Sequence, residues 1–264
     1  MLNCYEFLQF IRILNMRKLK ENFTSMMSCN QYYKHEEVEH AWVLACQFYK
    51  KEYKPILLKS GNLKLQKNVL IWDMPEIVTC KNNKACPGCY ALKASRIYKN
   101  TRVMRACHMA IIMQAIHDAK KLEYFKNYIQ LELDKHAMLY NMPVVRLHSA
   151  GDFYTSKYLQ LWLDIIENNK NIKFYSYSKI LHNTTINYIN GYYNNFNIVK
   201  SIIKINNNNY INYGNYEHLQ KITSQLIDNN INYHVCDYGT DNASTCMGNC
   251  TKCLTCPHVL FHKH

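Results

Sequence analysis

Short apolar runs alternate with helical patterns through the middle of the chain. Brief apolar stretches bounded by polar or turn residues predict strands at 69–72, 143–148, 172–177, 196–205 and 231–235. Helical spacing extends from Tyr90 to about Lys121 and again over Lys157–Glu167. The expected inward positions of the first helix are Ala91, Ala94, Ile97, Met104, Ala110 and Ile111. Strands separated by helices are typical of parallel βαβ units, so the sequence predicts an α/β fold.

The chain divides into three parts by composition. Residues 1–60 are expected to form a mostly helical extension, residues 61–235 the α/β core, and residues 236–264 a Cys-rich tail. We expect no membrane span, because no run of eighteen apolar residues occurs. The apolar, basic N-terminus lacks the order of a signal peptide, so a cytoplasmic and reducing compartment is expected.

Seven of the twelve cysteines fall in two tight clusters. The clusters consist of Cys80, Cys86 and Cys89, and of Cys246, Cys250, Cys253 and Cys256. Disulfides explain them poorly, because the compartment is expected to be reducing and such short loops strain the bond geometry. Thiolates are soft ligands that select zinc or iron–sulfur clusters, so the sequence predicts metal binding.

The second cluster has the spacing C-x3-C-x2-C-x2-C and is followed by Pro257. Zinc sites usually split their ligands into two separated C-x2-C pairs, whereas ligands crowded into one run are typical of ferredoxin-type loops. An iron–sulfur cluster is therefore favoured, with zinc as the alternative metal. Cys236 lies ten residues upstream and could replace one of the four ligands.

The first cluster offers three thiolates and no close fourth. Cys107 is too far along the predicted helix and is expected to be an ordinary buried residue. Three ligands to a [4Fe-4S] cluster leave one iron open to a substrate or cofactor, whereas the four-cysteine site is closed. The first cluster is therefore the candidate for chemistry, and the second for support or electron transfer.

Several polar features directly follow predicted strands. The first cysteine cluster, Asp152 and the segment after Val235 each come just past a strand end. Ligands of parallel sheets bind at the carboxyl ends of the strands. We therefore expect these three features to gather on one rim of the sheet.

The sequence resembles the phage family called gene product 88, from roughly Gly61 to His264. The landmarks are Ser60–Leu65, Thr79-Cys80 with Cys86 and Cys89-Tyr90-Ala91, Arg146–Phe153 and the Cys-rich stretch from Cys236 to Cys256. The resemblance implies a viral protein of the host cytoplasm and implies no particular reaction. The first sixty residues lie outside it.

The same landmarks resemble a diverged radical S-adenosylmethionine enzyme. That resemblance implies a full or partial parallel (βα) barrel in which the open iron binds S-adenosylmethionine and the tail holds an auxiliary cluster. Ala150-Gly151-Asp152 resembles the turn that contacts the amino group of the cofactor, and Tyr90 closes the cysteine loop. Gly151, Asp152 and Tyr90 are thus implied to bind the cofactor. The C-x5-C-x2-C spacing of the loop departs from the usual C-x3-C-x2-C.

Asp152, His148 and Arg146 are the candidate catalytic residues, and each has an ordinary alternative. Asp152 could instead cap the helix that begins near Lys157. His148 could be a hydrogen-bonded structural residue, and Arg146 and His148 could each face the barrel interior or the rim. Lys179, past the third strand, could contact an anionic substrate or be solvated.

The formal net charge of +13 favours an acidic partner, and nucleic acid or a nucleotide is the expected substrate class. An abundance of Asn, Lys, Tyr and Ile offers another explanation, a bias in the coding sequence. Two functions are therefore carried forward. One is a radical-SAM-like iron–sulfur enzyme, and the other is a non-enzymatic nucleic-acid-binding protein stabilised by zinc or iron–sulfur sites. No membrane partner is expected, and the sequence leaves the oligomeric state open.

Overall fold

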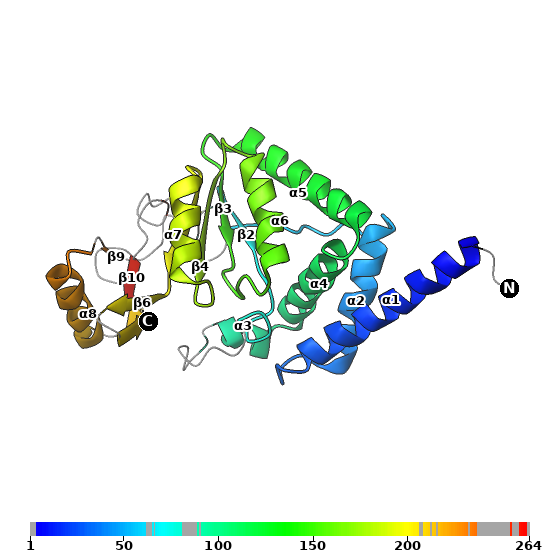
Figure 1. Cartoon of the computed structure of the whole chain (residues 1–264), viewed down its shortest axis with the longest axis horizontal. Helices are drawn as coiled ribbons and strands as arrows, with labels where there is room; N and C mark the ends of the chain where they lie inside the picture. Colours follow the sequence, from blue (N-terminus) through cyan, green and yellow to red (C-terminus); the bar gives the residue numbers. More distant parts are fainter. Residues whose placement is uncertain are drawn as a thin grey trace.

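A computed structural model gives the fold. It describes residues 4–61, 65, 67–80, 89, 91–205, 208–211, 213–214, 216–231, 233–236, 254 and 259–262. Figure 1 shows a central sheet with helices packed beside it, α1 extending at one end and the C-terminal strands with α8 at the other.

The central sheet is mostly parallel, as the sequence predicts. Its five strands follow the order β1-β2-β3-β4-β5, with only β1 antiparallel to its neighbour. The strands are β1 (Lys59–Ser60), β2 (Val69–Trp72), β3 (Val144–Leu147), β4 (Lys173–Ser178) and β5 (Phe196–Lys200). Neighbours in the sheet are thus neighbours along the chain, the arrangement of a singly wound α/β unit. Closure of the sheet into a barrel stays a prediction.

The helix expected from Tyr90 to Lys121 is wrong in its extent. Two shorter helices, α3 (Ala91–Ile97) and α4 (Lys99–Ala115), break at Tyr98, whose φ of −109° and ψ of 108° are extended. Ile97 in the last turn of α3 is 60% exposed and not inward, because α3 buries Ala91 and Ser95 instead. A further helix, α5 (Ala119–Leu139), was not predicted; Asp118 caps it by accepting hydrogen bonds from Lys120 N and Lys121 N.

The remaining crossovers match expectation more closely. Helix α6 (Ser156–Glu167) joins β3 to β4, and α7 (Asn183–Tyr192) joins β4 to β5. The strand expected over 196–205 is two strands, because the chain leaves the sheet at Ser201 and forms β6 (Ile202–Ile205), which pairs antiparallel with β7 (Asn208–Ile211).

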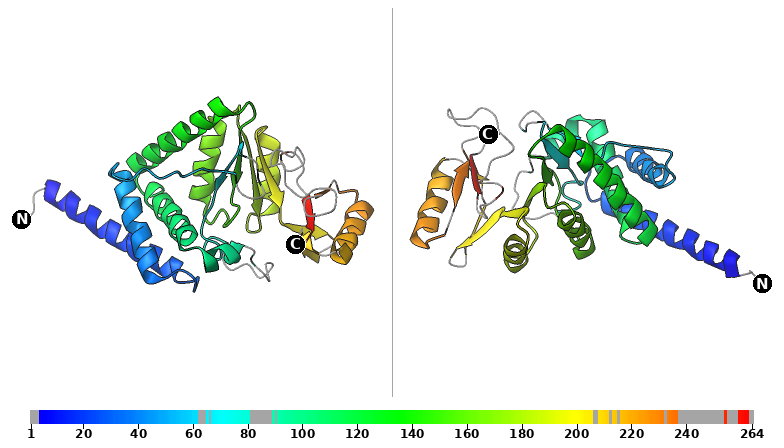
Figure 2. Two further views of the ribbon diagram at one scale, coloured as in Figure 1. Left: turned by 180° about the vertical axis from the view of Figure 1, so that it is seen from behind. Right: turned by 90° about the horizontal axis from the view of Figure 1, so that it is seen from above.

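A second, three-stranded parallel sheet follows, with the order β8-β10-β9. Its strands are β8 (Tyr213–Gly214), β9 (His234–Cys236) and β10 (Val259–His262), and α8 (Tyr216–Asp228) lies between β8 and β9. The expected strand over 231–235 is therefore shifted to 234–236. Figure 2 shows this second sheet with α8 beyond the end of the central one.

The two faces of the central sheet have different partners. Leu70, Trp72, Val145, Leu147, Phe174 and Ile198 point toward one face and share a core with the helices. The alternate residues, such as Ile71, Tyr175 and Val199, form a separate apolar cluster with Val259 of β10. Strand side chains alternate between faces, so the helices cover one face and the C-terminal strand packs against the other.

The N-terminal helices are α1 (Cys4–Met27) and α2 (His35–Tyr49), so the mostly helical start of the chain is confirmed. Phe23, Met27, Trp42 and Phe48 are buried in the same core as the sheet. Within the described ranges, every helix is too short or too polar to cross a bilayer.

A chain of hydrogen bonds links β2, α6, β3 and β4 through the core. Trp72 Nε1 donates to Tyr158 Oη (2.7 Å), which lies 2.8 Å from His148 Nε2. His148 Nδ1 lies 3.3 Å from Ser176 Oγ, which donates to the carbonyl of Leu147 (3.0 Å). An indole only donates and a carbonyl only accepts. The chain therefore runs in one direction, with the His148 proton on Nδ1.

We expect Tyr158→Phe to lower the free energy of unfolding by about 3 kcal/mol, because it leaves two buried polar groups, Trp72 Nε1 and His148 Nε2, without their partner. Tyr154→Phe is the matched control. The Tyr154 hydroxyl is also buried and has no hydrogen-bond partner among the described residues, so its removal should cost little. Urea denaturation of both variants measures the difference. Equal losses would show that the chain of hydrogen bonds contributes nothing specific.

Candidate functional site

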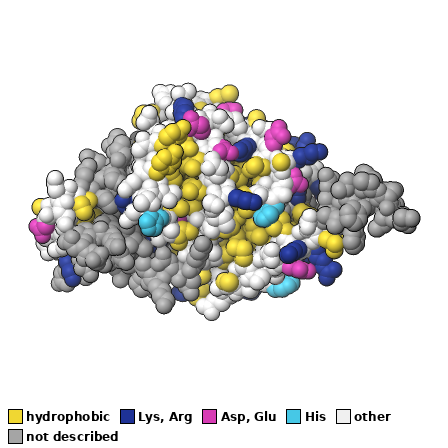
Figure 3. Space-filling model, viewed as in Figure 1, with side chains coloured by type: hydrophobic (Ala, Val, Ile, Leu, Met, Phe, Trp, Pro, Cys, Tyr) yellow, Lys and Arg dark blue, Asp and Glu magenta, His cyan; other side chains and the backbone are white. Residues whose placement is uncertain are grey.

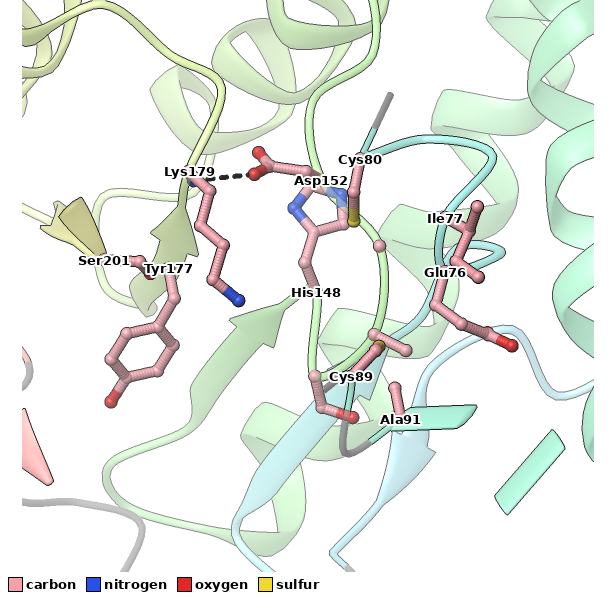
Figure 4. Close-up of a pocket in the computed structure, with 13 residues that line it drawn as sticks. Glu76, Ile77, Cys80, Cys89, Ala91, His148, Asp152, Tyr177, Lys179 and Ser201 are labelled. Carbon is pink, nitrogen blue, oxygen red and sulfur yellow. Dashed lines mark hydrogen bonds between the residues drawn. The ribbon is translucent and has the colours of Figure 1, made fainter. Parts of the chain in front are cut away.

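A pocket opens at the carboxyl ends of the central strands, where the loops after β2, β3 and β4 meet. Its volume is about 80 Å³, several times what one water molecule requires. Figure 4 shows Cys80 and Cys89 on one side, Tyr177 and Lys179 on the other, and His148 and Asp152 between them. The full lining is Glu76, Ile77, Cys80, Cys89, Ala91, His148, Ser149, Ala150, Gly151, Asp152, Tyr177, Lys179 and Ser201.

The loops after β2 and β3 are joined by three hydrogen bonds. Met74 N donates to Ala150 O (2.9 Å), and Ala150 N donates to Asp73 Oδ1 (2.8 Å). Asp152 N donates to Thr79 Oγ1 (3.1 Å). Because Thr79 directly precedes Cys80, these bonds fix the start of the cysteine loop against the Ala150-Gly151-Asp152 turn.

Gly151 is required by this close approach. Its φ of +86° lies in the left-handed region, and a Cβ there would lie 2.6 Å from Met74 Cβ and 2.7 Å from Thr79 Oγ1. Both the backbone conformation and the available space thus exclude a side chain. The turn can approach the β2 loop only because residue 151 is glycine.

Gly151→Ala should therefore lower the free energy of unfolding by about 2 kcal/mol or more, since the clash adds to the cost of a left-handed alanine. Gly191→Ala is the control. It lies in α7, a Cβ there would meet nothing within 4 Å, and alanine should stabilise the helix by up to about 1 kcal/mol. Thermal unfolding of the two variants should shift the midpoints in opposite directions. A neutral Gly151→Ala would contradict the packing described here.

The Asp152 carboxylate joins the β3 loop to the end of β4. Oδ1 accepts hydrogen bonds from Phe153 N (2.7 Å) and Ser178 Oγ (2.8 Å), and Oδ2 accepts one from Lys179 N (2.8 Å). Burial raises the pKa of this carboxyl, and these hydrogen bonds act in the opposite direction. The helix-cap interpretation is wrong, because Thr155 caps α6 by accepting from Tyr158 N.

His148 is buried at the base of the pocket, with both ring nitrogens in the hydrogen-bond chain described above. Burial lowers its pKa to about 3, so the ring is neutral at pH 7. This arrangement favours the structural interpretation of His148 over a role as acid or base. His148 (φ 64°) and Ile77 (φ 65°) both adopt left-handed backbone conformations beside the pocket. Such strain tends to collect at functional sites.

Acid should destabilise the protein through its buried neutral histidines. A folded-state pKa of about 3 for His148, below the unfolded value near 6.5, gives a stability contribution that is complete above pH 6.5 and decreases as the pH falls. His108, whose pKa burial lowers to about 4, acts in the same direction. We expect each histidine to cost about 1 kcal/mol between pH 7 and pH 5.5.

Replacing His148 by Asn, a residue that tolerates left-handed φ, should remove about 1 kcal/mol of that pH dependence whatever its effect on absolute stability. Urea denaturation at the two pH values gives both slopes. An unchanged slope in His148→Asn would mean that His148 is not buried as a neutral ring.

The structure describes two of the three cysteines in the first cluster. Cys80 and Cys89 are half-buried and line the same pocket as Gly151 and Asp152, so the expected gathering on one rim holds for these features. Cys86 and Tyr90 lie outside the described residues. Cys107 is fully buried, as expected, and burial raises the pKa of its thiol to about 12.

For the second cluster the described residues give only its surroundings. Cys236 ends β9 and, like Leu254, packs against the apolar cluster on the Ile71 face of the central sheet, which is the face opposite the crossover helices. Tyr177, which lines the pocket, packs against the same cluster. The four predicted ligands Cys246, Cys250, Cys253 and Cys256 lie outside the described residues, so their role stays a prediction.

Two basic side chains lie near the pocket. The Arg146 guanidinium is 5.1 Å from the centre of the Tyr177 ring, which places Arg146 on the Ile71 face of the central sheet. Figure 4 shows the Lys179 side chain extending into the pocket between Tyr177 and His148. Of the two, only Lys179 lines the pocket directly.

Sequence reasoning missed four polar residues that support the site. Glu76, which lines the pocket, forms a buried ion pair with Arg105 (2.9 Å). Thr79 and Ser178 bind Asp152. Glu76 offered one usable signal, a carboxylate between the strand and the first cysteine. Arg105 offered none, because an arginine in a helical pattern is normally solvated.

These features define an α/β protein with a mostly parallel sheet and a cysteine-lined pocket at the carboxyl ends of its strands. The sequence model of gene product 88 matches residues 47–259, and the chain belongs to that family. The match begins inside α2, earlier than the expected start at Gly61. Searches of curated proteins and of solved structures found no match to the chain.

Proposed function

We propose that this protein is a radical-SAM-like iron–sulfur enzyme whose first cluster is held by Cys80, Cys86 and Cys89. One observation carries the proposal: Cys80 and Cys89 line a single pocket with the Gly151–Asp152 turn, at the carboxyl ends of parallel strands. Strands in sequential order with helices on one face also support a partial barrel.

The residues present fit such a group. Both described thiols are half-buried, so they are shielded from bulk solvent and still open to a ligand in the pocket. A [4Fe-4S] cluster bound by three thiolates would offer an open iron able to bind the amino and carboxylate groups of S-adenosylmethionine and to supply an electron. An auxiliary cluster on Cys246, Cys250, Cys253 and Cys256, or with Cys236 in place of one, belongs to the same proposal.

In this proposal Asp152 positions the turn. A carboxylate offers about four lone-pair sites, and the hydrogen bonds from Phe153, Ser178 and Lys179 fill most of them. The side chain is therefore already committed to the protein, and its task is to hold the turn against the end of β4.

The substrate is proposed to carry an anionic group, and a nucleotide or nucleic acid is the favoured class. Lys179 brings a positive charge into the pocket opposite the cysteines, and Tyr177 and Ser201 lie on the same side. On the face shown in Figure 3, Lys and Arg side chains are scattered among acidic ones and do not form one patch. The pocket itself, and not that face, is the proposed contact with the substrate.

Anaerobically purified protein should contain iron and acid-labile sulfide and absorb broadly in the visible range. Cys80→Ala, Cys86→Ala and Cys89→Ala should each lose the iron of the first site and abolish reductive cleavage of S-adenosylmethionine. Cys29→Ala is the control, because Cys29 is exposed and belongs to neither cluster. Iron, sulfide and cleavage product are measured on the same samples.

Three outcomes separate the alternatives. A colourless protein with stoichiometric zinc would favour the non-enzymatic nucleic-acid-binding protein, whose affinity for nucleic acid should fall steeply with salt. Iron without cleavage under strong reduction would leave an iron–sulfur protein and remove the radical mechanism. Iron in amounts unchanged by the three substitutions would place it on the tail cysteines alone.

A further inference from the structure

We propose that Arg105 of α4 is the positioning residue of the cysteine loop, the segment from Cys80 to Cys89. Its guanidinium binds the chain on both sides of that loop and so holds the two ends together. That the cysteines of this loop are cluster ligands rests on the proposed function. That Arg105 holds the loop rests on its own contacts.

Arg105 reaches both ends of the loop with one nitrogen. Nη1 donates to Glu76 Oε2 (2.9 Å), four residues before Cys80, and to Ser95 Oγ (3.0 Å) and Ala91 O (3.3 Å), which follow Cys89. Nη2 lies 3.6 Å from Asp73 Oδ2. Asp73 in turn accepts the hydrogen bond from Ala150 N, so the same arginine also supports the Gly151 turn.

These bonds lie in the interior. Glu76 and Ser95 are fully buried, and Arg105 is 6% exposed. Water and salt therefore screen the contacts little. The bonds also depend on the planar, several-donor shape of guanidinium, which a lysine ammonium does not reproduce. A point charge could keep the pair with Glu76 but not all the contacts beyond Cys89.

The turn between α1 and α2 adds further contacts to this network of hydrogen bonds. Glu76 also accepts hydrogen bonds from Asn30 Nδ2 and Tyr33 Oη, both at 3.3 Å, in the turn between α1 and α2. These two residues precede residue 47, where the family match begins. Contacts to Glu76, the partner of Arg105, therefore come from a part of this chain that lies outside the matched region.

A second buried ion pair, between Arg102 of α4 and Glu37 of α2, allows a purely stabilising role to be tested. Arg102 forms a two-bond pair with Glu37 and donates to Ser95 O. Glu76, Asp73 and Ala91 bind Arg105 instead. Arg102→Gln should destabilise the fold much as Arg105→Gln does. Only Arg105→Gln should loosen both ends of the cysteine loop.

The experiment measures alkylation rates of individual cysteines by peptide mass spectrometry, using iodoacetamide on the metal-free full chain under native conditions. In Arg105→Gln, Cys80 and Cys89 should react about tenfold faster than in wild type, since hydrogen bonds to charged groups each shift a local opening by roughly that factor. In Arg105→Lys only the alkylation rate of Cys89 should increase. Cys107, fully buried in α4, reports global unfolding and should stay unreactive.

Wild-type rates at Cys80 and Cys89 in a folded Arg105→Gln would overturn the proposal, as would equal acceleration in Arg102→Gln. If Arg105→Gln does not fold, Ser95→Ala removes a single bond on the far side of the loop. Ser95→Ala should raise the alkylation rate of Cys89 more than that of Cys80. An equal increase at the two cysteines would also overturn the proposal. Because the protein is metal-free in these assays, a failure of the iron–sulfur proposal leaves the result unaffected.

Discussion

The close approach of the loops after β2 and β3 is the constraint on which the site depends. It brings Gly151 so near Met74 and Thr79 that no side chain fits, and it fixes the residue before Cys80 by a hydrogen bond from Asp152 N. The Asp152 carboxylate accepts hydrogen bonds from Ser178 Oγ and Lys179 N and so fixes the same turn against the end of β4. Three consecutive strand ends are thus held in one arrangement before any ligand is considered.

The winding of the chain places the crossover helices on one face of the central sheet and leaves the Ile71 face without them. Strands added one after another in the same direction place their crossover helices on one side, because such crossovers are right-handed. The other face of β2 to β5 still carries Ile71, Val144, Tyr175 and Val199, which need apolar cover. The chain supplies that cover with β10 and, at its edge, with Cys236 and Leu254.

The sequence predicted the parallel strands well, because their signal is local. Val69–Trp72 is found as predicted, and the strands at 144–147 and 173–178 lie within a residue or two of expectation. The glycine and acid of the 150–152 turn were also recognisable by position. Helix boundaries were less accurate, because Tyr98 and Asp118 end and restart helices through backbone conformation and capping that the apolar spacing does not reveal.

The supporting shell of the pocket could not be predicted, because its partners are far apart in sequence. Glu76 and Arg105 are 29 positions apart, and Ser178 at the end of β4 is 26 positions from Asp152. Single-residue patterns assign such residues to the surface, where charged and hydroxyl side chains usually lie. Only the folded structure shows that Arg105 neutralises Glu76 and that Ser178 binds Asp152.

Tyr177 connects the pocket to the apolar cluster on the Ile71 face of the central sheet. The residue lines the pocket, stacks with Arg146 and touches the apolar cluster that β10 completes. Val259 of β10 therefore belongs to an apolar cluster against which one lining residue of the cavity packs. Because β10 follows the lining residues in the chain, the packing around Tyr177 should become complete only after β10 has left the ribosome.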